Sequence, residues 1–243
     1  MSLRFHEIAE AGHRILNPFS AEKLRLLGEI CRIAPGTRQL DLACGKGELL
    51  SSWSSAYGLR GVGVDISHVF LDAARERAAE LGVAEDVEFV QGDAGAYDAG
   101  AGTFDIVSCI GATWIGGGLA GTLGLMRRPL KADGLVLVGE PYWSSEPPPG
   151  YGEDLKLTSL AGIGEVIERA GFELVEMVLG NQDDWDRYAA SQWLTLSDWI
   201  RANPADPEIE QVKAFLDSAR RSYLEWQRPH LGWGVFVLRP AAA

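Results

Sequence analysis

Short runs rich in aliphatic residues recur along the chain, and most are followed by a segment whose apolar residues have helical spacing. Five of these runs predict strands, at residues 39–43, 61–65, 87–90, 104–110 and 135–139. Apolar runs of this length are typical of strands buried on both faces of a sheet, and strands that alternate with helices form right-handed βαβ units. The pattern therefore predicts an α/β fold with a mostly parallel sheet and helices on both faces.

The end of the chain departs from this alternation. Further strands are predicted at residues 172–179 and 234–238, but residues 181–232 between them read as helical, whereas a hairpin needs only about 2–5 loop residues. Residues 1–34 also read as helical. We therefore predict a single domain over residues 1–243, in which the N-terminal segment and the insertion between the last two strands form a lid.

Composition narrows the choice of partners. The chain has 34 acidic and 22 basic residues and a net charge of −12, which repels the phosphate backbone that nucleic-acid-binding proteins neutralise with Lys and Arg. A small-molecule substrate is therefore favoured over a nucleic acid. No apolar stretch is long enough to span a bilayer, so no membrane partner is expected. The three cysteines lie far apart, which predicts neither a metal site nor a disulfide framework and favours a cytoplasmic setting.

A glycine-rich turn follows the first predicted strand. Gly45 and Gly47 allow the backbone to approach a ligand closely, and the helix that the turn opens favours negative charge at its N-terminus. The fingerprint of a protein that binds NAD would place a third glycine at position 50, where this chain has Leu50. The turn therefore favours a different nucleotide-like ligand, with a merely tight strand-to-helix turn as the alternative.

Acidic residues also follow the next two predicted strands, at the edge where open α/β sheets bind ligands. Asp65 is placed to accept hydrogen bonds from both hydroxyls of a ribose, or to interact with the helix that follows it. Asp93 is placed to accept from an adenine amino group, or to form an Asx turn beside Gly92. Together with Asp41 in the first strand, these acids favour a ligand that contains adenosine.

These segments resemble the class I S-adenosylmethionine-dependent methyltransferases, with matching order and spacing over residues 36–140. One departure is Ala43, where many members have glycine. The chain is also similar to a bacterial subfamily of small-molecule methyltransferases. The segments that carry the two resemblances are 40–47, 63–67, 92–94, 104–107 and 130–134 for the class, and 109–117, 139–143 and 232–234 for the subfamily.

The resemblance implies S-adenosylmethionine as the cofactor and a Rossmann-like seven-stranded sheet of order 3-2-1-4-5-7-6 with an antiparallel last strand. It also implies roles for the first strand and the turn after it. Asp41 would orient the amino group of the methionine moiety, and the backbone at Ala43, Gly45 and Gly47 would approach the cofactor closely.

The resemblance assigns further cofactor contacts to the next three strand ends. Asp65 would bind the ribose hydroxyls, and Ile66 would pack on the adenine. Asp93 and Ala94 would hold the adenine edge, and the loop that begins at Cys109 would line the methionyl arm.

Methyl transfer is an in-line displacement, in which the enzyme mainly aligns the reactants and excludes water. A general base is needed only if the acceptor must lose a proton. The candidates for the base are His13, with a surface position as the alternative, and Glu140, with a contact to backbone amides as the alternative. Tyr142 is placed to orient a substrate, with simple packing as the alternative. Trp114, among flexible glycines, is expected to form a cavity wall that places its ring over the sulfonium.

Two other functions remain open from the sequence. A domain that binds S-adenosylmethionine without catalysis would keep the same acids and glycines, and only an activity assay separates it from an enzyme. An NAD-dependent oxidoreductase is disfavoured by Leu50. The acid pair Asp183–Asp184 is expected to begin a helix, with recognition of a cationic substrate amine as the alternative.

Overall fold

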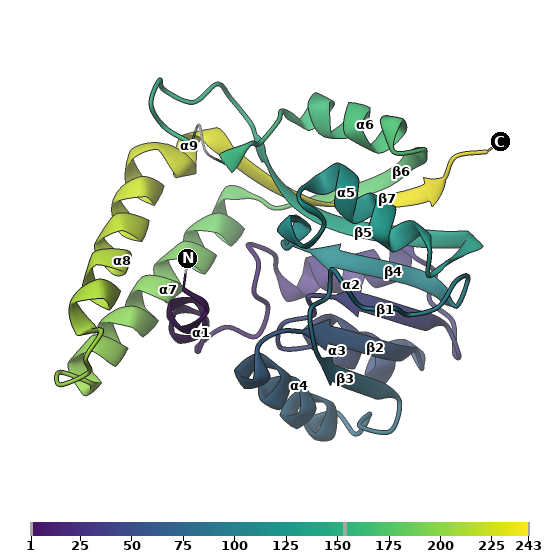
Figure 1. Ribbon diagram of the computed structural model, residues 1–243, viewed down its shortest axis with the longest axis horizontal. Helices are drawn as coiled ribbons and strands as arrows, with labels where there is room; N and C mark the ends of the chain where they lie inside the picture. The colour runs from purple at the N-terminus through teal and green to yellow at the C-terminus, as the bar shows by residue number, and fades with distance from the viewer. Residues whose placement is uncertain (1, 153–154, 243) are drawn as a thin grey trace.

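A seven-stranded sheet runs through the centre of the molecule (Figure 1). The computed structural model describes residues 2–152 and 155–242. Within that part of the chain the strand order is β3-β2-β1-β4-β5-β7-β6. The strands are β1 (Arg38–Leu42), β2 (Arg60–Asp65), β3 (Val87–Gln91), β4 (Phe104–Ile110), β5 (Leu130–Trp143), β6 (Phe172–Leu179) and β7 (Leu231–Pro240).

The directions of the strands confirm the predicted fold class. β1 pairs in parallel with β2 and β4, β2 with β3, and β4 with β5, while β7 runs antiparallel to both β5 and β6. Asp41 is level with Gly63 on one neighbouring strand and with Ser108 on the other. The carboxyl ends of the parallel strands therefore meet at one edge of the sheet, as an open α/β fold requires.

Helices cover both faces of the sheet, as predicted. On one face, α2 (Ala21–Ile30), α3 (Glu48–Tyr57) and α4 (His68–Glu80) pack on a hydrophobic core that includes Trp53 and Leu137. The indole of Trp53 is buried and donates a hydrogen bond to the Leu24 carbonyl at 3.1 Å, which joins α3 to α2. On the other face, α5 (Leu119–Arg127) and α6 (Leu160–Arg169) pack on a second core.

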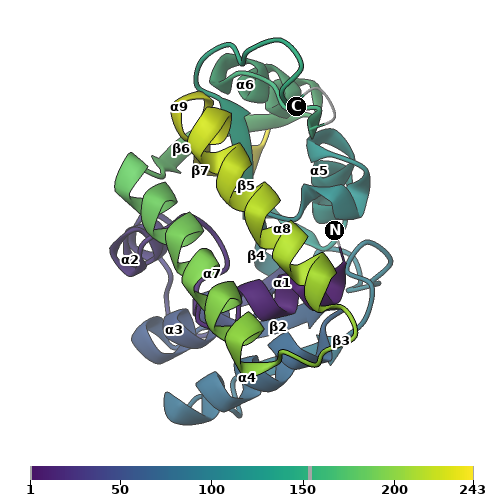
Figure 2. The ribbon, with the colours of Figure 1, turned by 90° about the vertical axis from the view of Figure 1, so that its left-hand side faces the viewer.

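A third group of helices lies beyond the carboxyl edge of the sheet. The insertion after β6 forms α7 (Gln182–Ala202) and α8 (Ile209–Ser222), followed by a π-helical turn at Tyr223–Gln227 and the short α9 (Arg228–His230). Figures 1 and 2 show α7 and α8 side by side, with α1 (Leu3–Ala9) against them. Ala9 of α1 packs in one small core with Leu196, Val212 and Leu216 of the insertion. We call α1, α7 and α8 the helical cap.

Two segments of the structure differ from the sequence prediction. Residues 10–20, expected to be helical up to a break, instead form turns that join α1 to α2 and cross the carboxyl edge of the sheet. β5 begins at Leu130 rather than 135, because the stretch read as a turn continues the strand with a register shift against β4. Gly134 permits this shift, since a Cβ there would lie 2.8 Å from the Asp105 carbonyl oxygen.

Candidate active site

A cavity of about 680 Å³ opens between the carboxyl ends of the strands and the helical cap. Sites for small molecules commonly have volumes of about 300–1,000 Å³. Its walls come from the ends of β1 to β5 and β7, from residues 14–19 and from α7. The sequence-predicted residues on its walls are Asp41, Ala43, Gly45, Asp65, Ile66, Asp93, Ala94 and Trp114.

Asp41 is a buried carboxylate at the floor of this cavity, only 4% exposed. It accepts a hydrogen bond from the Ser108 hydroxyl at 2.6 Å, and Ser108 in turn accepts one from the Gln39 amide at 2.8 Å. Burial raises the pKa of Asp41 to about 7, with a further contribution from the negative charge of Asp65. No cation pairs with Asp41 among the described residues. A buried carboxylate of this kind fits a ligand that brings its own ammonium group.

The glycine-rich turn is shaped by residues with left-handed backbone. Ala43 has φ +57°, the conformation that a glycine would adopt without strain, whereas alanine pays about 1–2 kcal/mol for it. The alanine therefore keeps the backbone path of the motif in which many relatives have glycine. At Gly47, with φ +64°, a Cβ would lie 2.5 Å from the ring of Phe89, so this position admits no side chain. Gly47 itself is not among the residues that line the cavity.

Asp65 is fixed at the end of β2 by the backbone around it. One carboxylate oxygen accepts from the Gly45 amide at 2.8 Å and the other from the Ser67 amide at 2.9 Å. Burial raises the pKa of Asp65, and these two amides oppose the rise by stabilising the charged form. Ile66 follows with 62% of its surface exposed at the cavity wall.

Asp93 forms the Asx turn that its position in the sequence allowed. Its Oδ1 accepts from the Gly95 amide at 2.8 Å, which is an Asx turn, while the residue also lines the cavity beside Ala94. Trp114 lies in a short 3₁₀ helix at Thr113–Gly116 and is 72% exposed. The carbonyl of its neighbour Ile115 lies 2.5 Å from the Cβ position of Gly95. Trp114 therefore lies near the Asp93 end of the cavity.

Cys109, Glu140 and Tyr142 do not line the cavity. Cys109 is fully buried in the core beneath α5, and the following residues, Ile110 to Ala112, form the wall instead. Along β5 the side chains alternate between faces, so Pro141 reaches the cavity while its neighbours point to the side of α5 and α6. These placements do not support the cofactor contact expected of Cys109, the role of Glu140 as a general base or the role of Tyr142 in orienting a substrate.

Glu140 has a different environment from the one expected. Its carboxylate accepts a hydrogen bond from the Thr113 hydroxyl at 2.7 Å, and burial raises its pKa to about 7. The contact ties the end of β5 to the 3₁₀ helix that carries Trp114. Glu140 therefore supports a wall of the cavity from behind.

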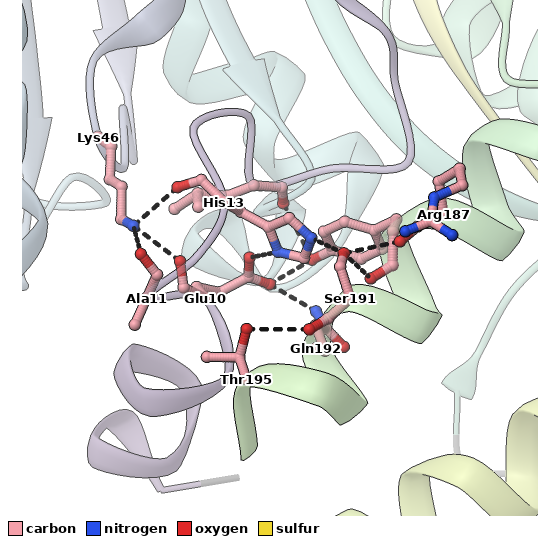
Figure 3. A network of polar contacts seen from close by, with 10 residues as sticks. Glu10, Ala11, His13, Lys46, Arg187, Ser191, Gln192 and Thr195 are labelled. Carbon is pink, nitrogen blue, oxygen red and sulfur yellow. Dashed lines mark hydrogen bonds and ion pairs between the residues drawn. The ribbon is translucent and has the colours of Figure 1, made fainter. Parts of the chain in front are cut away.

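His13 takes part in a polar network between the N-terminal segment and α7 (Figure 3). Its Nδ1 lies 2.7 Å from a carboxylate oxygen of Glu10, its Nε2 contacts the Ser191 hydroxyl, and its ring stacks on Tyr188 with centroids 5.0 Å apart. Both ring nitrogens are therefore engaged, and His13 does not line the cavity. The geometry does not support its expected role as a general base.

Glu10 is the centre of this network and has no exposed surface. Besides His13, it accepts hydrogen bonds from the Tyr188 hydroxyl and the Gln192 amide, both at 2.6 Å. Burial alone would raise the pKa of Glu10, but the hydrogen bonds from His13 and Tyr188 hold it below its usual value. Sequence analysis missed Glu10, Tyr188 and Ser108, because nothing in their local patterns indicates partners so distant in the chain.

Comparison with known proteins agrees with this geometry. Residues 40–134 match the family described as a methyltransferase domain. The protein YjhP of Escherichia coli is 43% identical over 242 residues, which cover 97% of each chain. A crystal structure of an S-adenosylmethionine-dependent methyltransferase from Geobacter sulfurreducens, in complex with S-adenosylhomocysteine, is 43% identical, covers 98% of each chain and superposes with a TM-score of 0.93. The corresponding complex from Thiobacillus denitrificans is 40% identical, covers 99% of each chain and has a TM-score of 0.91.

The fold, the cavity at the carboxyl edge of the sheet and these comparisons together define an α/β protein that uses S-adenosylmethionine. The chain belongs to the class I S-adenosylmethionine-dependent methyltransferases. Within the described ranges, no helix is both long and apolar enough to cross a membrane. The same ranges contain no cluster of three or more His, Cys, Asp or Glu side chains that could hold a metal ion.

Proposed function

We propose that this enzyme transfers a methyl group from S-adenosylmethionine to a small molecule held in the same cavity. The observation that carries the assignment is Asp41, a buried carboxylate without a cationic partner among the described residues. The ammonium group of the methionine moiety would supply that cation. Asp65 would accept from the ribose hydroxyls, and Asp93 with Ala94 would hold the adenine edge.

The apolar walls near Asp93 complete the proposed cofactor site. Ile66 and Trp114 both line the cavity and are largely exposed. Large apolar side chains that are exposed together commonly mark an interaction site. We expect them to cover the adenine. Trp114 is then an adenine contact rather than the ring over the sulfonium that the sequence suggested.

When bound, S-adenosylmethionine supplies a methyl group already activated by a sulfonium. The chain therefore mainly has to align the acceptor, exclude water and keep the reactants in place. The segment at residues 14–19 and the residues of α7 that line the cavity lie over the carboxyl edge of the sheet and would act as the lid. A small acceptor is favoured because it must share about 680 Å³ with the cofactor and because the net charge of −12 repels nucleic acids.

Calorimetry tests the proposed cofactor site. Wild-type protein should bind S-adenosylhomocysteine, and Asp41→Asn should bind it at least about tenfold more weakly, which corresponds to about 1.4 kcal/mol. The asparagine still accepts from Ser108 but cannot pair with an ammonium. Asp72→Asn, on the exposed outer face of α4, is the matched control and should bind like wild type. Wild-type protein that binds NAD but not S-adenosylhomocysteine would overturn the proposal.

Binding alone does not separate an enzyme from a non-catalytic domain that holds the cofactor. Release of S-adenosylhomocysteine from S-adenosylmethionine in the presence of acceptor candidates makes that distinction. Because Cys31, Cys44 and Cys109 are free thiols, a form favoured in a reducing compartment, we also propose that the protein works in the cytoplasm.

A further inference from the structure

The sheet order divides the cavity into two halves. Residues from the ends of β1, β2 and β3 and the loop after β4 line the half assigned above to the cofactor. Beyond β4 the wall comes from the ends of β5 and β7, from residues 17–19 and from α7. We call this second part the acceptor half, because a nucleophile must approach the methyl group from the side that the cofactor leaves open.

The acceptor half is lined by large apolar rings. Phe19 and Trp233 pack with centroids 5.4 Å apart at an interplanar angle of 60°, and both are almost completely buried. Pro141, Ile110 and the half-buried Trp185 complete the wall. These rings, with the less buried Trp185, make the wall apolar and favour a ligand that presents an apolar ring to it.

The charged side chains on the cavity wall all have partners away from the acceptor half. Arg14 pairs with Glu80 at the end of α4, and Glu48 pairs with Arg77 of the same helix. Lys46 donates to three main-chain carbonyls of the N-terminal segment. The remaining carboxylates, at Asp41, Asp65 and Asp93, belong to the cofactor half.

Two polar side chains of α7 also make contacts away from the acceptor half. The Tyr188 hydroxyl, on a residue of the wall, donates to Glu10. Asp184, one of the two acids considered as a site for a cationic amine, closes a capping box with Asn181 at the start of α7 and pairs with Lys23. Neither Asp183 nor Asp184 lines the cavity, so the pair gives no support to a cationic substrate there.

Asn17 is a polar side chain of the acceptor half, together with the Trp185 indole, whose buried N–H has no hydrogen-bond partner among the described residues. Its Nδ2 donates to the Ile110 carbonyl at 3.3 Å, which fixes the orientation of the amide. Its Oδ1 lies 2.1 Å from the position that a Cβ would take on Gly111, at the junction of the two halves. None of the described residues donates a hydrogen bond to this oxygen. Asn17 thus presents an acceptor of hydrogen bonds beside the loop that follows β4.

We propose that the methyl acceptor is an uncharged molecule with a flat apolar ring, whose O–H or N–H group donates a hydrogen bond to Asn17 Oδ1. This inference rests on the proposed function, since it assigns the half of the cavity that the cofactor leaves open. A charged acceptor would lose its hydration among Phe19, Trp185 and Trp233 without gaining an opposite charge. Asn17 is a positioning residue that orients the nucleophile toward the methyl group. As the oxygen or nitrogen of the acceptor bonds to the methyl carbon, the carbon–sulfur bond breaks, S-adenosylhomocysteine leaves with that electron pair, and the proton of the acceptor passes to solvent.

Three probes with the same ring system test the charge preference. 2-Naphthol, 2-naphthoate and 2-naphthylmethylammonium are titrated by calorimetry into wild-type protein saturated with S-adenosylhomocysteine, whose neutral sulfur removes any attraction by a sulfonium. We expect 2-naphthol to bind at least tenfold more tightly than either ion. Equal or tighter binding of one ion, or no binding of 2-naphthol, would overturn the inference.

Variants of Asn17 test its role with the same probes. Asn17→Asp places a carboxylate of nearly the same shape in the acceptor half, so it should weaken 2-naphthoate further and bring 2-naphthylmethylammonium to at least the affinity of 2-naphthol. Gln211→Glu makes the same change on the exposed surface of α8 and should leave the order of the three probes as in wild type. Unchanged probe affinities in Asn17→Asp would contradict the assignment.

Two further measurements keep the outcomes separate. Asn17→Ala removes the oxygen without adding charge and should weaken 2-naphthol at least fivefold; if it binds 2-naphthol like wild type, Asn17 has no such role. Each protein is also titrated with S-adenosylhomocysteine alone. Failure of wild type to bind S-adenosylhomocysteine would refute the proposed function, whereas normal binding with the wrong probe preference would refute only the inference about the acceptor.

Discussion

Lys46 and His13 are joined by a hydrogen bond of 2.7 Å from the Lys46 ammonium to the main-chain carbonyl of His13. The same ammonium donates to the carbonyls of Glu10 at 2.7 Å and Ala11 at 3.1 Å. Lys46 lies between the two glycines of the turn that is proposed to hold the cofactor. The contact therefore connects that turn directly to the segment that crosses the cavity (Figure 3).

Replacement of this ammonium should loosen the lid. Lys46→Met keeps the aliphatic chain but removes all three hydrogen bonds, and a hydrogen bond to a charged group contributes about 1.5–3 kcal/mol. We expect faster hydrogen exchange in residues 10–19 and about tenfold faster dissociation of S-adenosylhomocysteine in stopped flow. Lys213→Met, an exposed change on α8, is the control. Unaltered exchange and dissociation in Lys46→Met would show that the contact does not restrain the lid.

Binding of S-adenosylhomocysteine should depend on pH through Asp41. The pKa of this carboxyl is raised to about 7 in the free protein, so at pH 6 it is mostly protonated and must lose its proton before it can pair with an ammonium. The affinity should therefore fall by up to about tenfold per pH unit below pH 7. Calorimetry in two buffers with different heats of ionisation should detect the released proton. Asp41→Asn should abolish both effects, and an affinity of wild type that is constant from pH 8 to pH 6 would argue against this pairing.

Glu140 should lower the stability of the protein at alkaline pH. Its pKa is about 7 in the folded protein and near 4.5 when unfolded, so the folded state binds the proton more tightly. Between these values stability falls as pH rises, and well above pH 7 the full cost of the buried charge, about 3 kcal/mol, is present. Glu140→Gln, which can still accept from Thr113, should unfold at a higher denaturant concentration than wild type at pH 8 but not at pH 5.

The control for this measurement is Glu88→Gln, which changes an exposed carboxylate on β3. It should unfold like wild type at both pH values. A Glu140→Gln variant that is less stable than wild type at pH 8 would mean that the carboxylate is stabilised by its surroundings more than burial destabilises it.

Trp114 should report the arrival of the cofactor. With 72% of its surface exposed, it emits at a long wavelength, and cover by an adenine ring would alter both the intensity and the wavelength. We expect S-adenosylhomocysteine to change the tryptophan emission of wild type and of the control Trp193→Phe. Trp193 lies on α7 and does not line the cavity. Trp114→Phe should lose most of this change and bind several-fold more weakly. A full emission change in Trp114→Phe would place the adenine elsewhere.

Local pattern in the sequence determined the sheet and the acids at its edge. Short aliphatic runs that end in turn residues fit strands covered on both faces, and parallel strands bring their carboxyl ends together. Asp41, Asp65 and Asp93 therefore had to meet once the five strands were recognised, and the structure places all three on the wall of one cavity. The order of the strands came from resemblance to a family rather than from pattern.

Tertiary structure alone decided which side chains face that cavity. Alternation along β5 turns Pro141 inward and Glu140 and Tyr142 away, and the register shift near the start of this strand was not visible in the sequence. The contact of His13 with Ser191 joins residues 178 positions apart. Such pairs are determined by how the helical cap packs on the sheet, because hydrogen-bond partners distant in the chain leave no periodic signal in either segment.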